Sequence, residues 1–251
     1  MKKNFIFLFV LLASSLLFAQ NKEKEIAEKE YQDFLKLNSS SINIEKTVLT
    51  KQHIINYKGD KGQKSQDYVY CLLHKNGQCV QIKAKNKIQY FFSSDQGYWL
   101  FTNKLKSPLK VQGSYKVEEA DVQDILKLDF EKEYDILDFK DSILSLERKG
   151  QKSAYKFIFF EKTSSNEYTI IFADNKKNPV RKLVYHSGEV DGINTFKQID
   201  IYNLLFKRKA YSSWVTESIK EVNIPSSFFS YSKIKQLTEK MSSILKEENK
   251  K

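Results

Sequence analysis

The side chains best suited to chemistry are few and lie far apart. The sequence holds two cysteines, Cys71 and Cys79, and three histidines, His53, His74 and His186, without an HExxH, a CxxC or a mixed His/Cys/Asp cluster. Metal sites need such ligands at close spacing, so no metal is predicted. A Gly-x-Ser-x-Gly elbow and a glycine-rich phosphate loop are also missing, so no cofactor is predicted. His74 stands beside a turn, which predicts a surface position.

Carboxylates offer another kind of chemistry, and four of them gather at Glu118, Glu119, Asp121 and Asp124. Acids in the first turn of a helix offset its dipole, and helical spacing puts the two aspartates on the face away from the apolar residues. Acid–base catalysis is the weaker interpretation, because isolated carboxylates without a perturbing partner rarely mark a site. We therefore predict no catalytic residue and no enzyme.

The two cysteines lie on either side of a predicted hairpin turn. With Asn76-Gly77 as a two-residue turn, Cys71 faces Ile82, and Cys79 lies on the opposite face of the hairpin. The sulfurs are then about 10 Å apart along the strand, which exceeds the reach of a disulfide. Two cysteines in an exported chain often pair, but this geometry predicts two unpaired thiols.

The first residues have the order of a secretory signal. Two lysines precede an apolar run from Phe5 to Phe18, which ends in the small residue Ala19. The run is shorter than the roughly 20 residues of a membrane anchor. No cysteine follows it to accept a lipid. Residues 1–19 are therefore predicted to be a signal peptide that is cleaved after Ala19, and the protein is predicted to be exported.

Charge and composition narrow the partners and the domain count. The formal net charge is +11, but no block of five or more like charges is present, which argues against a nucleic-acid partner. Export argues against it too. The sequence has three prolines, eight glycines and no Gly/Ser/Pro-rich linker. These features predict one domain over residues 20–251, present as a monomer.

Apolar periodicity predicts the elements of that domain. Helical stripes predict an N-terminal helix over residues 22–38 and a C-terminal helix over about 232–247. Between about 44 and 222, β-branched and aromatic runs alternate with short polar breaks, as in an antiparallel meander. Residues 118–130 are predicted to interrupt this sheet as a helix. The predicted class is α+β.

Several strands are apolar on both faces. In the run SAYKFIFF, Tyr155, Phe157 and Phe159 point one way, and Ile158 and Phe160 point the other. An antiparallel sheet exposed on one side alternates more strictly, so this sheet is expected to be covered on both sides or rolled around an interior. A well-filled core and a ligand cavity both explain the pattern.

The segment GYWLF, followed by TNKLKSPLKVQGS and EEADVQDILKLDFEKEYDI, resembles the periplasmic outer-membrane lipoprotein-sorting (LolA-like) family. The later segment NEYTIIFADNKKNPVRKLVYHSGEVDGINTFKQIDIYNL and the ending IPSSFFSYSKIKQL are also similar to it. Lysines stand where family members often carry loop arginines, and no arginine is assigned to the lining. The matching positions in the first segment are Trp99, Phe101, Pro108, Lys110, Gly113, Asp124, Asp129, Phe130 and Tyr134.

The resemblance implies a strongly curved antiparallel sheet, an incomplete β-barrel, with helices covering the open side of a hydrophobic cavity. It also implies a periplasmic carrier, or chaperone, that binds acyl chains of lipoproteins or lipids and moves them toward the outer membrane without a cofactor. Such a carrier docks transiently on a membrane or a membrane protein. The alternative is an exported, non-catalytic envelope scaffold with a dry aromatic core.

Candidate residues for the cavity follow from this resemblance and from the helical stripe. The predicted lid residues are Val122, Ile125, Leu126 and Phe130, spaced to share one helical face. Alternation along the strands does not say which face points inward. The predicted lining residues are Tyr68, Tyr70, Trp99, Phe101, Phe157, Phe159, Ile170 and Phe172.

Overall fold

The β-branched and aromatic runs fold as strands of one continuous sheet. The computed structural model describes residues 21–38, 45–58, 61–84, 87–94, 96–117, 120–126, 128–205 and 212–248; the predicted signal peptide lies outside them. The strands are β1 (Val48–Lys58), β2 (Lys61–His74), β3 (Gly77–Ala84), β4 (Lys87–Ser94), β5 (Gly97–Phe101), β6 (Leu109–Val111), β7 (Lys116–Val117), β8 (Ala120–Asp121), β9 (Tyr134–Lys140), β10 (Ile143–Arg148), β11 (Phe157–Ser164), β12 (Glu167–Ala173), β13 (Pro179–Val190), β14 (Ile193–Asn203) and β15 (Ser212–Glu221).

Helices lie at both ends of the described chain and in its middle. The predicted terminal helices are present as residues 21–38 and as α4 (Ile234–Glu248). Two one-turn helices, α2 (Val122–Ile125) and α3 (Phe130–Glu133), follow β8. Short 3₁₀ turns, η1 (Ser226–Phe228) and η2 (Tyr231–Lys233), lead into α4. Among the residues described, no helix combines the length and the apolarity needed to cross a membrane.

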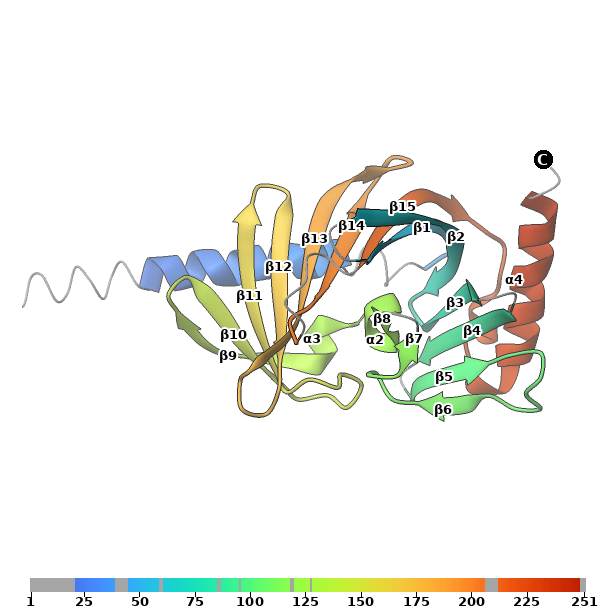
Figure 1. Cartoon of the computed structure of the whole chain (residues 1–251), viewed down its shortest axis with the longest axis horizontal. Helices are drawn as coiled ribbons and strands as arrows, with labels where there is room; N and C mark the ends of the chain where they lie inside the picture. The colour runs from blue at the N-terminus through green and yellow to red at the C-terminus, as the bar shows by residue number, and fades with distance from the viewer. Residues whose placement is uncertain are drawn as a thin grey trace, which may run out of the picture.

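The sheet is open and entirely antiparallel. Its 13 strands run in the order β6-β5-β4-β3-β2-β1-β15-β14-β13-β12-β11-β10-β9, and β7 pairs with β8 in a separate hairpin. Because β6 and β9 stand at opposite ends of this order, the sheet does not close into a barrel. It curves around α2 and α3, while α4 lies outside it (Figure 1). The predicted α+β class with an incomplete barrel is confirmed.

Alternate residues along the strands serve two separate cores. The face toward α2 and α3 carries the interior core, which includes Phe91, Phe160 and Tyr185. The opposite face of β1–β5 carries the outer core, in which Phe92 and its neighbours pack under α4. This explains the strands that are apolar on both faces. The outer core consists of Leu49, Leu72, Cys79, Tyr90, Phe92, Trp99, Phe101, Ile224, Phe229, Ile234, Leu237, Met241 and Leu245.

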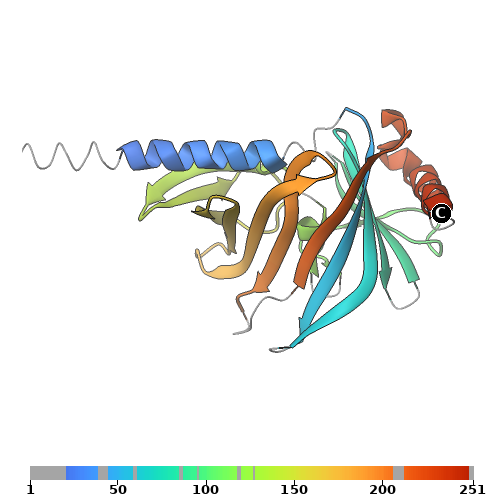
Figure 2. The same cartoon turned by 90° about the horizontal axis from the view of Figure 1, so that it is seen from above.

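Helix 21–38 runs along the other half of the sheet (Figure 2). Its Phe34 is completely buried and stands in the middle of a group of aromatic rings. The ring centroids of Phe130, Phe160, Tyr168, Tyr185 and Phe196 lie 5.2–5.6 Å from it. The helix therefore inserts a ring into the interior core instead of lying on the surface of the sheet.

The predicted continuous helix over residues 118–130 is wrong. Residues 118 and 119 lie outside the described residues, and the rest forms β8, α2 and α3. The reason is the spacing of Leu126, Leu128 and Phe130, which are all buried in the interior core. Side chains at i, i+2 and i+4 share one face of an extended chain but not of a helix. Asp129 then starts α3 by accepting a hydrogen bond from the Lys132 N–H at 3.2 Å.

The hairpin that carries the two cysteines has a different strand register from the predicted one, but the cysteines lie on opposite faces of the sheet as predicted. Lys75 and Asn76 form the turn, so that Cys71 faces Val80 instead of Ile82. Cys71 belongs to the interior core and Cys79 to the outer core, on opposite faces of the sheet. Neither cysteine takes part in a disulfide, as predicted.

Burial makes the reactivity of these thiols depend on unfolding. Both are buried, and burial raises the pKa of Cys79 far above its usual range. We expect iodoacetamide to leave Cys79 unmodified in the native protein. In denaturant without reductant, two alkylations are expected by mass spectrometry. An unmodified pair in denaturant would instead reveal a disulfide.

The surface position predicted for His74 is wrong, because its side chain is buried beneath the outer core. Its Nδ1 accepts a hydrogen bond from the Asn76 N–H at 3.0 Å, and its Nε2 lies 3.1 Å from the Glu45 carbonyl oxygen. This pair of contacts requires the neutral tautomer with a proton on Nε2. Burial lowers the pKa of His74, in agreement with that state.

Candidate functional site

The segment between β6 and β9 crosses the interior face of the sheet. We call residues 113–117, 120–126 and 128–133 the inserted segment. The Val122 N–H donates to the Tyr115 carbonyl at 2.9 Å, and the Gln123 N–H donates to the Gly113 carbonyl at 3.0 Å. These bonds fold the segment back on itself, so that β8 and α2 form one compact unit.

The apolar side of the inserted segment faces the interior core. All four predicted lid residues are buried in this core. The Phe130 ring lies 5.3 Å from Phe34 and 6.3 Å from Phe172. Ile170 and Phe172, predicted for the lining, belong to the same core. The structure therefore brings together Val122, Ile125, Leu126, Phe130, Ile170 and Phe172.

The other predicted lining residues lie elsewhere. Trp99 and Phe101 belong to the outer core, and Tyr70 is partly buried against it. Tyr68 is exposed under the ammonium of Lys51, which lies 3.8 Å from its ring centroid. In β11 the interior positions are Ile158 and Phe160. Phe157 and Phe159, which lie on the other face of β11, do not belong to the interior core.

Beneath the inserted segment lies a buried charged cluster. Arg181 on β13 is 2% exposed, and its guanidinium contacts Asp121 Oδ2 at 3.2 Å and Asp124 Oδ2 at 2.7 Å. The Tyr155 hydroxyl donates to Asp121 Oδ2 at 2.6 Å. The Lys116 ammonium lies 2.5 Å from Asp121 Oδ1. Two carboxylates of the inserted segment are thus paired with a cation of the sheet.

The cluster corrects two interpretations of the sequence. Asp121 and Asp124 do not point to solvent, because their side chains are fully buried. An arginine does face the interior, although none was assigned there. The alternation along β13 indicates this position. Arg181 is two residues from Leu183 and four from Tyr185, so its side chain lies on the same face of the strand as these two interior residues.

Burial and mutual pairing set the protonation of the cluster. Burial raises the pKa of Asp124 to about 6, although Arg181 favours its charged form. For Arg181, burial opposes the charge, but the two aspartates outweigh it and raise its pKa. Burial and Asp121 raise the pKa of Tyr155, which keeps its hydroxyl protonated as a donor. The cluster is suited to holding the inserted segment on the sheet, because its groups are occupied with one another.

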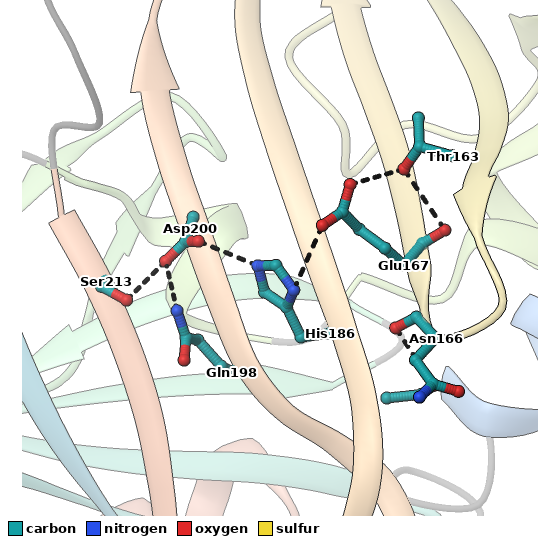
Figure 3. Close-up of polar contacts among 8 residues, drawn as sticks. Thr163, Asn166, Glu167, His186, Gln198, Asp200 and Ser213 are labelled. Atoms are coloured by element: carbon teal, nitrogen blue, oxygen red, sulfur yellow. Dashed lines mark hydrogen bonds and ion pairs between the residues drawn. The ribbon is translucent and has the colours of Figure 1, made fainter.

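A second polar cluster lies on the opposite face of the sheet (Figure 3). His186 Nε2 lies 2.9 Å from Asp200 Oδ2, and His186 Nδ1 lies 3.5 Å from Glu167 Oε2. The Ser213 hydroxyl donates to Asp200, and the Thr163 hydroxyl donates to Glu167 at 2.6 Å. Because Ser213 contacts the carboxylate instead of the imidazole, His186 is not placed to activate it as a nucleophile.

An apolar pocket of about 20 Å³ lies under the inserted segment, between the β7–β8 hairpin and strands β1, β3 and β15. That volume is about the room needed by one water molecule. Among the described residues, no group of three or more His, Cys, Asp or Glu side chains is placed to hold a metal ion. The pocket is lined by Ile54, Asn56, Ile82, Val117, Ala120, Ser212 and Trp214.

Comparison with known proteins identifies the fold. No protein-family model and no curated protein sequence matches the chain. A solved LolA superfamily protein from Nitrosomonas europaea aligns with 79% of this chain and 96% of its own, at 15% identity and a TM-score of 0.62. A putative outer membrane lipoprotein-sorting protein domain from Vibrio parahaemolyticus aligns with 81% of this chain and 97% of its own, at 14% identity and a TM-score of 0.56.

A third solved structure is a DUF1329 family protein from Desulfovibrio piger. It aligns with 85% of this chain and 98% of its own, at 15% identity and a TM-score of 0.57. All three align over nearly their whole lengths, and at identities this low the likeness concerns the fold. The chain therefore has a LolA-like fold, as implied by the resemblance of residues 97–136 and of the two later segments.

Proposed function

We propose that the protein is a periplasmic carrier that binds the acyl chains of lipoproteins or lipids and moves them toward the outer membrane. The observation that carries the proposal is the buried ion-pair cluster between Arg181 and the inserted segment. It holds a segment with an apolar underside against an apolar sheet face. A closure of this kind is what a carrier needs to shield cargo and to release it.

In this proposal an acyl chain displaces the inserted segment and supplies part of the free energy that opening requires. The 20 Å³ pocket is far too small for such a chain, so cargo that enters at this point has to displace the segment. Each buried methylene contributes about 0.8 kcal/mol. Roughly ten methylenes would thus contribute about 8 kcal/mol toward separating the ion pairs and the apolar contacts. The interior residues Ile158, Phe160, Ile170 and Phe172 would then contact the chain.

The basic surface suits delivery to a membrane. The formal net charge of +11, which falls to +9 without Lys2 and Lys3 of the predicted signal peptide, favours transient docking on anionic headgroups, and salt would weaken that docking. The chain acts as a monomer in this proposal. The solved lipoprotein-sorting domain from Vibrio parahaemolyticus supports the cargo class by its fold.

Replacing Asp124 with asparagine tests the closure. Asparagine is neutral, like the protonated carboxyl that burial favours in the closed form, so we expect a fluorescent fatty acyl probe to enter about tenfold more slowly at pH 7.5. Stopped-flow fluorescence measures this rate. The control is Glu189→Gln, which neutralises an exposed carboxylate that makes no ion pair among the described residues.

The pH dependence provides a second readout of the same variant. Burial raises the pKa of Asp124 to about 6 in the closed form, above its value of 3.8 in solvent. The closed form therefore binds the proton more tightly, and lowering the pH from 7.5 to 5 favours closure and slows uptake. Asp124→Asn should flatten this dependence. Identical rates and pH profiles in the variant and the native protein would remove the closure from the proposal.

A dry aromatic core is the competing explanation, and the close packing around Phe34 favours it. In that case the protein would be an exported, non-catalytic scaffold. Native mass spectrometry of the protein purified from its own envelope separates the two. Co-purified lipid or acylated peptide supports the carrier. A bare mass, together with no uptake of the acyl probe, supports the scaffold.

A further inference from the structure

A pocket of about 460 Å³ lies where the two halves of the open sheet approach each other. One wall comes from β5, β6 and the residues that follow, and the other from the end of β10 and its loop toward β11. Figure 1 shows that loop extending toward β6. The pocket is distinct from the apolar pocket under the β7–β8 hairpin, with which it shares no lining residue.

The lining of this pocket is cationic. Lys110 comes from one wall, and Arg148 and Lys152 come from the other. No aspartate or glutamate is found among the described residues that line it. The remaining lining is mostly glutamine, serine, glycine and backbone. Positive groups on facing walls repel one another, and an anion bound between them relieves that repulsion.

Both walls are attached to the inserted segment. The Gln123 N–H donates to the Gly113 carbonyl at 3.0 Å on one wall, and Gln123 Oε1 accepts the Ala154 N–H at 2.9 Å on the other. The Glu133 carboxylate accepts the N–H groups of Lys152 and Ser153 at 2.9 Å and 3.1 Å. An anion that draws the walls together would therefore act on the segment that covers the interior core.

Gln123 also contains an unused donor. It is only 3% exposed, and its Nε2 has no hydrogen-bond partner among the described residues. Gly113 lies against it, since a Cβ there would meet Gln123 Oε1 at 2.8 Å and the Lys152 carbonyl at 2.6 Å. The walls can approach this closely only because residue 113 lacks a side chain.

We infer that this pocket, the cationic pocket, binds a phosphate group. Three cations from two walls match the tetrahedrally arranged oxygens of a phosphate group better than the single plane of a carboxylate. The volume leaves room for the polar group that carries the phosphate. Resting on the proposed function, the ligand is the headgroup of an anionic amphiphile whose acyl chains enter the interior. A free phosphate anion shares the same chemistry.

Calorimetric titration of the full mature chain tests this inference. The probes are dihexanoyl phosphatidylglycerol, its neutral counterpart dihexanoylglycerol, and inorganic phosphate. The pocket variant combines Lys110→Gln, Arg148→Gln and Lys152→Gln, and its control combines Lys83→Gln, Lys235→Gln and Lys240→Gln at exposed sites with the same charge change. Because Arg148 also donates to the Ser153 carbonyl at 2.7 Å, Lys110→Glu serves as a second variant at an exposed position.

We expect the native protein to bind the phosphatidylglycerol at least about tenfold more tightly than dihexanoylglycerol. The pocket variant should lose about 30-fold in affinity for the anionic lipid, and Lys110→Glu should abolish the preference. The charge-matched control should bind as the native protein does. Binding of inorganic phosphate as tight as that of the lipid would identify a free phosphate as the ligand.

Two results would overturn the inference: no binding of any phosphate probe by the native protein, or unchanged affinity in both the folded pocket variant and Lys110→Glu. The proposed function fails separately. Suppose that inorganic phosphate binds the native protein but not the pocket variant, while neither lipid nor a neutral acyl probe is taken up. The phosphate site is then supported, and the carrier function is excluded.

Discussion

Replacement of Arg181 by alanine should lower the free energy of unfolding by about 3–5 kcal/mol, because it leaves two buried carboxylates without their cation. Asp121 and Asp124 are fully buried, and the exposed Lys116 reaches only the first of them. Urea unfolding followed by circular dichroism measures the change. The matched control is Lys197→Ala, which removes an exposed cation from the neighbouring strand β14.

The same experiment can separate charge from packing. A variant that combines Arg181→Met, Asp121→Asn and Asp124→Asn removes the charges together, and we expect it to recover most of the lost stability. Its inserted segment should nevertheless open more readily to an acyl probe, since the ion pairs that fix its position are gone. If Arg181→Ala were no more costly than Lys197→Ala, the cluster would not hold the segment.

Phe34→Ala should also destabilise the protein by about 3–5 kcal/mol, because it empties the centre of the aromatic group. Its ring lies within 6.2 Å of Tyr31 and closer still to Phe130, Phe160, Tyr168, Tyr185 and Phe196. Thermal or urea unfolding measures the loss. Ile26→Ala is the control on the same helix, where the side chain is 49% exposed and little change is expected.

The Phe34→Ala variant also tests whether cargo occupies the interior core. A cavity lined by apolar and aromatic side chains stays dry and accepts small apolar molecules. If cargo occupies the interior core, Phe34→Ala should bind a short acyl probe more tightly than the native protein, at a temperature where both are folded. Weaker binding would indicate that the ring forms part of the cargo surface instead of filling its place.

Much of the fold was predictable because its patterns are local. The run FIFF at the start of β11 and the run YTIIF within β12 consist entirely of β-branched and aromatic residues, and the stripe of Ile234, Leu237 and Met241 predicted α4 correctly. The cysteine prediction succeeded despite a shift of two residues in register, because such a shift leaves every side chain on its own face.

The errors arose where distant segments decide the outcome. Asp121 and Asp124 suit the start of a helix locally, and only the approach of β13 makes them partners of Arg181. Likewise, alternation in β11 defines two faces but does not indicate which one meets the inserted segment. His74 was assigned to the surface because a turn follows it, whereas Phe229, remote in sequence, covers its ring at 5.1 Å.

The position of β15 in the sheet also governs how the chain can fold. It pairs with β1 in the middle of the strand order, so Val48 lies opposite Glu221. The strands on either side, β2–β6 and β9–β14, can form by neighbouring hairpins as they emerge. The two halves of the sheet can join only through the pairing of β1 with β15, near the end of the chain. Contacts between residues so far apart in the sequence form slowly. Completion of the interior core is therefore a late event in folding, because it requires β15 to be present.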